Sequence, residues 1–439
     1  MKRKQESTIR WFLLITTFVM IILRVLLNEK GRVNPDSIRY FRTAKVFPVI
    51  DNTTTPLGYP LFIKFFAFLS DEFWASKIIG LLSFLFIIYF AWKKKFYFKE
   101  TLITAALFSY VSIFSYSMSE TLILPFVFVF LYIGRQIIIG ELSGKKAIIY
   151  LSLILILMYN IRYSALFFIL SVFGFGILYY KKNYAKIFLI SALPGLLYIV
   201  LYKYFFIDYF NQDYIKEFLK IGLKPSSELL VELFQGLCTS FNPFIHIASP
   251  SGGFINYGIY GIGALNIFIM LYLFLKNKVS ASEKFLLFTG LFTIICSYFI
   301  QYFYSVNPLD YRLLSPFILS IWLVYFKKLF NIFGLYTYSI AILSLMTGFL
   351  FTWLSRGNYL ENRKNITRFL VNEKLDKVPL KYYLINDSDT EKKVQVAELI
   401  STVNPQVSIT FKPKDTLEES TLTEYKVSSK IKISKNPFQ

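Results

Sequence analysis

Long apolar segments recur along most of the chain and are separated by short clusters of lysine and arginine. Each segment approaches the ~20 residues that an α-helix needs to cross a bilayer. The pattern therefore predicts about eleven membrane-spanning helices. Their expected positions are residues 11–27, 75–92, 101–117, 121–139, 147–160, 164–180, 187–206, 257–275, 285–304, 311–326 and 336–354.

The basic clusters between these segments predict the orientation of the chain. When every span is counted, the clusters fall on the same side as the N-terminus; they occupy residues 93–99, 135–146, 181–186, 276–284 and 327–328. Cytoplasmic loops are enriched in lysine and arginine, so this side is predicted to be cytoplasmic. The opposite side then receives residues 28–74, a loop at 207–256 and the chain after Trp353.

Composition supports a membrane protein and argues against a nucleic-acid partner. The 439 residues are 55% hydrophobic and 19% aromatic, which is more apolar than a soluble domain. The formal net charge is +21, but the cations lie between spans, where membrane topology explains them. The first 27 residues also fit an export signal; because no small-residue cleavage site follows, we interpret them as the first span.

The end of the chain differs from the rest and predicts a separate domain. Residues 355–439 are polar and contain a strand pattern in "KYYLI", a helix pattern in "DTEKKVQVAELIST" and a second strand in "QVSITF". The predicted fold is an all-α polytopic membrane domain at 1–354, with surface helices in the first outer loop, followed by a small extracytoplasmic α/β domain at 355–439. The two cysteines, Cys238 in a loop and Cys296 in a span, argue against a disulfide framework.

The stretch "NPDSIRY" places charged residues directly after the first span. Asn34 suits the N-cap and Pro35 the first position of a helix, which puts Asp36 in the first turn. Asp36, Arg39 and Tyr40 then share one helical face. An ionised carboxylate there is a candidate general base, and its two neighbours are candidate substrate contacts. The alternative is an exposed helix pair without a catalytic role.

The next segment, "DNTTTPLGYPLFIKFFAFLSDEF", is interrupted by proline and glycine before a short apolar run. It is predicted to lie along the membrane surface rather than to cross it. Tyr59 is a candidate substrate contact, although an ordinary interfacial tyrosine explains it equally well.

Three further charges fall at span ends on the predicted outer side. In "SYSMSETLILPF", Ser119 is expected to cap a helix that has Glu120 in its first turn. Arg162 and Arg312 lie in "MYNIRYSALFF" and "NPLDYRLLSPF", where charges are costly and tend to mark ligand sites. The guanidinium of arginine can donate two parallel hydrogen bonds to a phosphate, which makes both arginines candidate phosphate ligands. The alternatives are internal pairing with Asp310 or Glu120, or snorkelling to lipid headgroups.

The remaining candidate substrate contacts are Tyr163, Asp310 and His246, the single histidine. A lone histidine cannot build a metal site without carboxylates, and an ordinary loop residue is the alternative reading. The sequence contains no P-loop, dinucleotide-binding glycine motif or nucleophile elbow, so soluble nucleotide chemistry on the cytoplasmic side has no support.

Taken in order, "NPDSIRY", "TTTPLGYPLF", "SMSETLILPF", "NIRYSALFF" and "DYRLLSPF" resemble the motifs of membrane glycosyltransferases of the GT-C fold, over about residues 8–330. The similarity is to the dolichyl-phosphate-mannose-protein mannosyltransferase-like and aminoarabinose-transferase-like group. It implies transfer of a sugar, with inversion, from a polyprenyl-phosphate carrier to a glycan, lipid or protein acceptor outside the cytoplasm.

The resemblance also implies roles for individual residues. Asp36 corresponds to the first-loop acid that acts as base, and Glu120 to the acid at the junction of the third and fourth spans. Both are therefore expected to be catalytic. Arg162 and Arg312 correspond to residues that hold the carrier phosphate. Asp36 lacks an acidic neighbour, so a metal-dependent arrangement has no support and no cofactor is expected.

Two other functions fit a chain of this type. An O-antigen-type polysaccharide polymerase or ligase also has many spans and outer arginines. A lipid or solute transporter would more often place its charges near the midplane, whereas here they fall at span ends. The bias towards Lys, Phe, Tyr and Ile indicates an AT-rich bacterial genome, which predicts an inner-membrane protein with a periplasmic active site.

Overall fold

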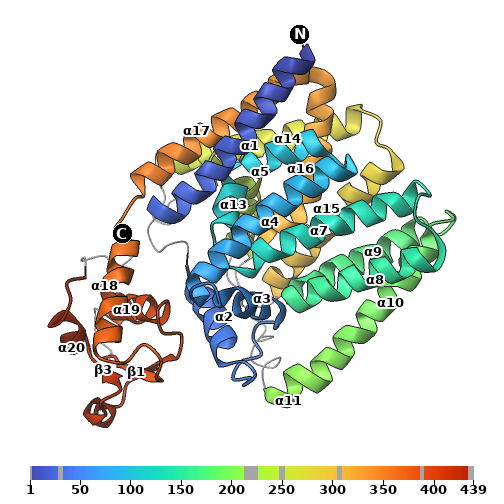
Figure 1. Cartoon of the computed structure of the whole chain (residues 1–439). Helices are drawn as coiled ribbons and strands as arrows, with labels where there is room; N and C mark the ends of the chain where they lie inside the picture. The colour runs from blue at the N-terminus through green and yellow to red at the C-terminus, as the bar shows by residue number, and fades with distance from the viewer. Residues whose placement is uncertain are drawn as a thin grey trace.

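The computed structural model describes residues 2–27, 33–211, 226–246, 253–303, 309–385 and 390–433. Helices form a bundle, and a small α/β unit lies at one end of it (Figure 1). Among the described residues, eight helical segments are long and apolar enough to cross a membrane. The chain is therefore a multi-pass integral membrane protein.

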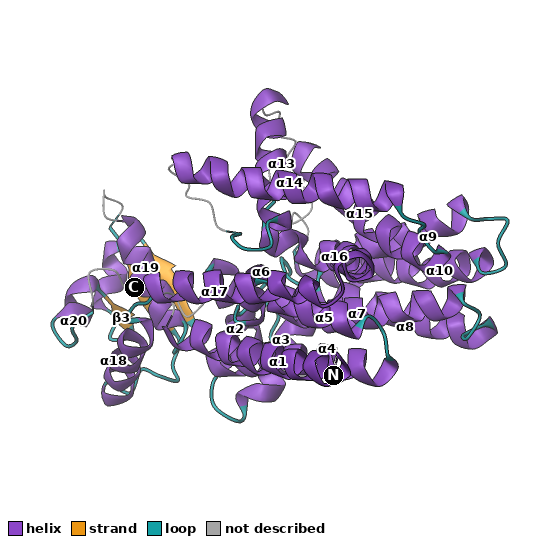
Figure 2. Ribbon diagram, turned by 90° about the horizontal axis from the view of Figure 1, so that it is seen from above, coloured by secondary structure: helices purple, strands orange, loops and turns teal. Residues whose placement is uncertain are grey.

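Ten of the predicted spans coincide with a described helix. These helices are α1 (Lys2–Leu27), α4 (Glu72–Lys94), α7 (Ser119–Ile138), α8 (Gly144–Ile161), α9 (Leu166–Leu178), α10 (Ala185–Tyr202), α14 (Phe254–Lys276), α15 (Ala281–Phe303), α16 (Tyr311–Phe333) and α17 (Tyr338–Leu354). Two of them that are far apart in sequence, α1 and α17, pack against each other (Figures 1 and 2).

The other predicted span, 101–117, is helical but not one continuous helix. The chain forms α5 (Phe98–Ala106) and α6 (Phe108–Phe114), separated at Leu107, whose ψ of 137° is extended. The Ser344 hydroxyl on α17 accepts a hydrogen bond from the Phe108 backbone N–H at 2.8 Å. This contact from another helix replaces an intrahelical bond, so the apolar pattern alone did not reveal the break.

The predicted surface helices are confirmed as α2 (Pro35–Val46) and α3 (Gly58–Ala67). At 1.5 Å per residue each is shorter than about 20 Å, too short to cross a bilayer. Asn34 caps α2 as expected: its side chain accepts the Ser37 N–H, and the Ser37 hydroxyl accepts the Asn34 N–H. This capping box fixes Asp36 in the first turn.

The predicted outer loop at 207–256 contains a helix that the sequence did not reveal, α13 (Ser226–Phe241). It packs against α14 and α16. Cys238, expected in a loop, is buried within this helix. The loop begins with the short helix α11 (Asp208–Phe210), and its residues 212–225 and 247–252 lie outside the described residues.

The crossing of α13 and α14 depends on Gly263. A Cβ added there would lie 2.0 Å from the Cys238 carbonyl oxygen, a backbone atom that cannot move without shifting α13. We expect Gly263→Ala to lower the free energy of unfolding by about 1–3 kcal/mol through overpacking. Gly261→Ala on the same helix is the matched control because no atom lies within 4 Å of its added Cβ. Thermal unfolding in detergent measures both; equal effects of the two substitutions would contradict the close approach.

The C-terminal unit confirms the predicted strand, helix and strand as β1 (Leu380–Tyr383), α19 (Thr390–Ser401) and β2 (Val407–Thr410). Its other elements are α18 (Tyr359–Asn372), β3 (Thr421–Leu422) and α20 (Glu424–Ser428). Figure 2 shows the strands in orange. They are parallel in the order β2-β1-β3, with Leu380 opposite Val407. The domain boundary at 354/355 stays a prediction.

This unit is held against the membrane bundle by Arg363 on α18. Its Nη2 lies 2.6 Å from the Asp71 carboxylate at the start of α4 and donates to the Thr402 carbonyl at 2.9 Å. The guanidinium also stacks over the Phe73 ring, 4.5 Å from its centre. The side chain thus joins α4, α18 and the end of α19.

The bundle has two chemically different ends. α4 and α7 lie side by side along the bundle. At one end, Ser76 near the start of α4 hydrogen-bonds Ser117 just before α7. At the other end, Lys94 at the end of α4 lies over the Tyr132 ring of α7. The second end, here called the basic end, also holds Lys327 and Lys328, which pair with Glu283 at 2.8 and 2.9 Å. Four of the five predicted basic clusters meet at this end, because Lys327 lies over the Tyr97 ring, Arg135 lies over the Phe96 ring and Lys328 donates to the Lys278 carbonyl. The assignment of this end to the cytoplasm stays a prediction.

Candidate active site

Glu120 lies at the end of the bundle opposite the basic end, in the first turn of α7. Its side chain is only 1% exposed. A buried carboxylate is costly unless cations and hydrogen bonds compensate it. Glu120 is therefore expected to have close positive partners, and the structure supplies two.

Both partners are the arginines singled out in the sequence. Arg162, which ends α8, places Nη1 2.8 Å from Oε1 of Glu120. Arg312, in the first turn of α16, places Nε 3.5 Å from the same oxygen. We call Glu120, Arg162 and Arg312 the Glu120 cluster. The internal pairing weighed in the sequence is thus present, and it brings two cations from separate hairpins to one point.

The two arginines differ in how fully their hydrogen-bond donors are used. Arg162 also donates from Nε to the Ser164 hydroxyl at 2.7 Å. The Arg312 Nε is buried and has no hydrogen-bond partner among the described residues, since 3.5 Å to Glu120 is long for such a bond. A guanidinium carries five N–H donors, so Arg312 retains capacity to bind a further acceptor.

Helix α2 is joined to this cluster through Tyr40. The buried Tyr40 hydroxyl donates to the Ser119 hydroxyl at 3.0 Å, and Ser119 donates to Glu120 at 3.4 Å. Burial, and then the charge of Glu120, raise the pKa of Tyr40 well above its usual range. Tyr40 therefore stays protonated and can keep donating this hydrogen bond.

Asp36 is one turn before Tyr40 on the same helix, on the more exposed side. Its side chain is 42% exposed, and Arg39 lies 3.3 Å from its carboxylate. Tyr40, one turn further along α2, links this helix to Glu120 through the Ser119 hydroxyl, which places Asp36 at the same end of the bundle as the Glu120 cluster. Asp36, Glu120, Arg162 and Arg312, which the sequence predicted on the outer side, are therefore found at one end of the bundle, with the exposed Asp36 on its accessible side.

Asp310 lies two residues before Arg312 and is the N-cap of α16. Its Oδ1 accepts the Leu313 N–H at 3.1 Å. Burial raises the pKa of Asp310 above its usual range, and the charge of Arg312 opposes this rise. The carboxylate thus fixes the start of α16 and the position of Arg312.

The aromatic candidates are mostly packed into the fold. Tyr59 on α3 is fully buried and meets Tyr40 edge-on, with ring centres 4.9 Å apart. Tyr163 donates to the Thr53 carbonyl at 2.9 Å and so ties η2 (Tyr163–Ala165) to the first outer loop. His246, 3% exposed, lies between the Phe108 and Tyr311 rings. Their substrate contacts stay predictions.

Two site residues were missed or misread in the sequence. Ser119 was expected to cap α7, but Met118 is the N-cap and makes no side-chain cap, so that expectation is wrong. The Ser119 hydroxyl instead links Tyr40 to Glu120. Ser164 had no sequence signal, because serine next to an arginine is common and only the turn after α8 brings its hydroxyl to Arg162.

An apolar groove between α3, α4, α7 and α8 lies near this end of the bundle. It has a volume of about 380 Å³, and its α7 wall includes Leu122 and Val129. At about 100° per residue these side chains project roughly 180–200° from Glu120 around the helix. The groove is therefore on the opposite face of α7 and does not line the Glu120 cluster.

Comparison with solved structures places this arrangement in a known fold. The chain is similar to the crystal structure of ArnT from Cupriavidus metallidurans bound to undecaprenyl phosphate, with a TM-score of 0.58, 9% identity, and coverage of 95% of this chain and 89% of that chain. The chain has the GT-C fold. The Archaeoglobus fulgidus oligosaccharyltransferase tethered with an acceptor peptide aligns with a TM-score of 0.49 and 12% identity, over 91% of this chain and 63% of that chain.

No protein-family model matches the sequence, and no curated protein matches it. The GT-C fold that the order of the motifs predicted is thus confirmed by three-dimensional similarity. At 9% identity this similarity concerns the fold, and the chemistry must be argued from the site itself.

Proposed function

We propose that the protein is a membrane glycosyltransferase that moves a sugar from a polyprenyl-phosphate carrier to an extracytoplasmic acceptor, with inversion at the anomeric carbon. The observation that carries the proposal is the convergence of Arg162 and Arg312 on the buried Glu120, where the Arg312 Nε makes no hydrogen bond within the described residues. Support also comes from the GT-C fold and from its presence in a protein crystallised with undecaprenyl phosphate.

In this proposal the arginines bind the carrier phosphate at the depth where a lipid-linked donor presents it. Guanidinium groups donate parallel hydrogen bonds to phosphate oxygens and remain charged at all relevant pH values. Glu120 is a positioning residue: its carboxylate fixes both arginines and offsets part of their mutual repulsion. When the sugar leaves, the phosphate gains a negative charge, which the arginines stabilise.

Asp36 acts as the general base. It removes the proton from the acceptor hydroxyl or amine while the acceptor atom attacks the anomeric carbon from the side opposite the phosphate. The bond between that carbon and the phosphate oxygen breaks, and polyprenyl phosphate departs with the bonding electrons. The 42% exposure of Asp36 allows an acceptor to approach from outside the bundle.

Binding of undecaprenyl phosphate tests the phosphate site without knowledge of the sugar. We expect Arg312→Gln to weaken this binding by roughly ten- to a hundredfold, the effect of one lost charged hydrogen bond. Native mass spectrometry in detergent measures it. Arg356→Gln is the matched control, because Arg356 is an exposed arginine at the same end of the bundle, stacked on Trp353.

Equal affinity of the wild type and Arg312→Gln would overturn the phosphate assignment. An O-antigen-type polymerase or ligase is distinguished by its product. Mass spectrometry after incubation with lipid-linked donors should show the addition of one monosaccharide and the release of polyprenyl monophosphate. Transfer of a preassembled oligosaccharide would favour the alternative.

A further inference from the structure

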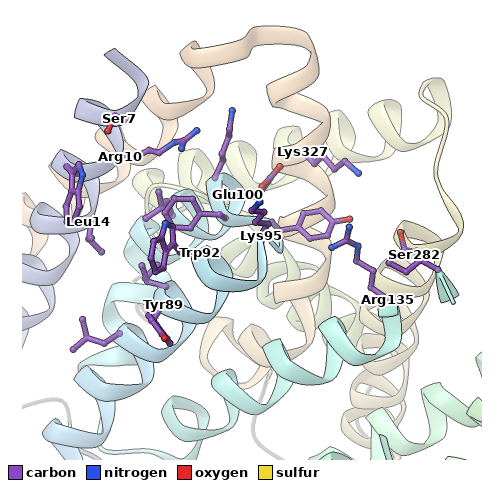
Figure 3. Close-up of a pocket in the computed structure, with 18 residues that line it drawn as sticks. Ser7, Arg10, Leu14, Tyr89, Trp92, Lys95, Glu100, Arg135, Ser282 and Lys327 are labelled. Atoms are coloured by element: carbon purple, nitrogen blue, oxygen red, sulfur yellow. The ribbon is translucent and has the colours of Figure 1, made fainter. Parts of the chain in front are cut away.

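A cavity of about 1120 Å³ opens at the basic end of the bundle, far from the Glu120 cluster (Figure 3). Arg135, which lines it, lies fifteen residues after Glu120 on α7, about 22 Å along the helix axis. The walls come from α1, α4, α5 and α7, with one residue each from α15 and α16. The proposed sugar transfer does not use this cavity.

The edge of the cavity has the composition of a membrane–water interface. Trp11, Tyr89 and Trp92 line it and are 63%, 52% and 61% exposed. Tryptophan and tyrosine with exposed rings concentrate at the depth of lipid headgroups. The exposed rings on α1 and α4 therefore mark a lateral opening towards the lipid.

The polar part of the cavity is rich in cations. Lys99 and Arg10 share the single charge of Glu6, and Lys327 shares Glu283 with Lys328, so each of these groups keeps about one net positive charge. Glu100 is a carboxylate that also lines the cavity. Lys95 and Arg135 also line the cavity and take part in no ion pair within the described part of the chain. Arg135 lies over the Phe96 ring at 5.7 Å, which leaves its N–H donors available for an anion.

The other wall of the cavity is apolar. Leu14 of α1, Leu85 and Ile88 of α4, and Leu102 of α5 line it. The cavity thus combines cations with an apolar wall, and Figure 3 shows Lys95 and Arg135 together with Leu14 of α1 and Trp92 of α4. The exposed aromatic rings at its edge put the cations at headgroup depth. A free phosphate would contact the cations and leave the apolar wall unoccupied. A lipid with an anionic headgroup would contact both.

We propose that this cavity binds an anionic membrane phospholipid. Lys95 and Arg135 bind its phosphate, and the acyl chains lie against α1 and α4 below Trp92. The bound lipid joins α1, α4 and α7 at the end of the bundle where α5 is short and separated from α6. This inference does not depend on the proposed sugar transfer.

Thermal unfolding of the purified full-length protein in nanodiscs tests the inference, with phosphatidylcholine alone compared with phosphatidylcholine plus phosphatidylglycerol. We expect phosphatidylglycerol to raise the Tm. Each cation near the lipid phosphate contributes about fivefold in affinity, so Lys95→Gln with Arg135→Gln should weaken phosphatidylglycerol binding roughly thirtyfold. The rise in Tm should then largely disappear, and native mass spectrometry with phosphatidylglycerol measures the affinity directly.

Lys145→Gln with Lys146→Gln is the matched control, since both lysines are exposed at the start of α8, at the same end of the bundle and outside the cavity. The control should retain the rise in Tm. An equal loss in both double variants would show a general effect of surface charge and overturn the site. A similar rise with inorganic phosphate in phosphatidylcholine nanodiscs would assign the cavity to a soluble anion instead. If the Lys95→Gln with Arg135→Gln variant has a much lower Tm than the wild type in phosphatidylcholine alone, Arg135→Lys is measured in its place. This substitution keeps the positive charge and should keep the rise in Tm with phosphatidylglycerol.

Discussion

Asp36→Asn is expected to lower kcat for sugar transfer by about 10²–10⁴-fold, the usual contribution of a general base. The amide has nearly the same size as the carboxylate but cannot accept the acceptor proton. Because the pair with Arg39 is exposed, its loss should change the free energy of unfolding by no more than about 1 kcal/mol. A transfer assay in proteoliposomes, with a thermal unfolding scan of the same preparation, separates the two effects.

Asp51→Asn is the matched control for this prediction. Asp51 is a carboxylate of the same outer loop, partly exposed and paired with Arg42 at 2.6 Å. It should retain its turnover, and undecaprenyl phosphate should bind both variants as it binds the wild type. Normal turnover by Asp36→Asn would remove Asp36 from the chemistry, and equal losses in both variants would indicate a disturbed loop rather than a missing base.

The second large effect is expected at the Glu120 cluster. Arg162→Gln leaves the buried Glu120 carboxylate with Arg312 at 3.5 Å as its remaining charged partner in the cluster. Breaking a buried pair in this way costs about 3–5 kcal/mol, because the other charge is left uncompensated. We therefore expect a large fall in stability together with loss of transfer.

The double variant Glu120→Gln with Arg162→Gln distinguishes structure from function. It removes both charges of the closest pair, so it should recover much of the stability lost in Arg162→Gln. Transfer should remain low because one of the two phosphate-binding arginines is still absent. Arg42→Gln, which breaks an exposed pair, provides the control and should cost less than about 1 kcal/mol.

If the stability loss of the double variant equals the sum of the losses in Glu120→Gln and Arg162→Gln, then Glu120 and Arg162 do not interact as the structure indicates. Recovery of transfer along with stability would show that Arg162 acts only by packing, and the phosphate site would then rest on Arg312 alone. Unfolding in detergent and the proteoliposome assay together provide both readouts.

Features set by neighbouring residues were predictable from the sequence. The spans follow from runs of apolar residues, and the two ends of the bundle from the lysines and arginines between them. The start of α2 follows from Asn34 and Pro35, because a cap depends on the residues of a single turn. The strands and helix of the C-terminal unit follow from their local periodicity in the same way.

The tertiary structure alone decided which distant residues meet. Arg162 and Arg312 belong to separate hairpins, and the sequence left open whether they pair internally or bind headgroups; helix packing brings both to Glu120. The break at Leu107 depends on Ser344 from α17, and the basic cavity depends on six helices. Such contacts carry no local signal, because the free energy that selects them comes from side chains that become neighbours only after the helices have packed.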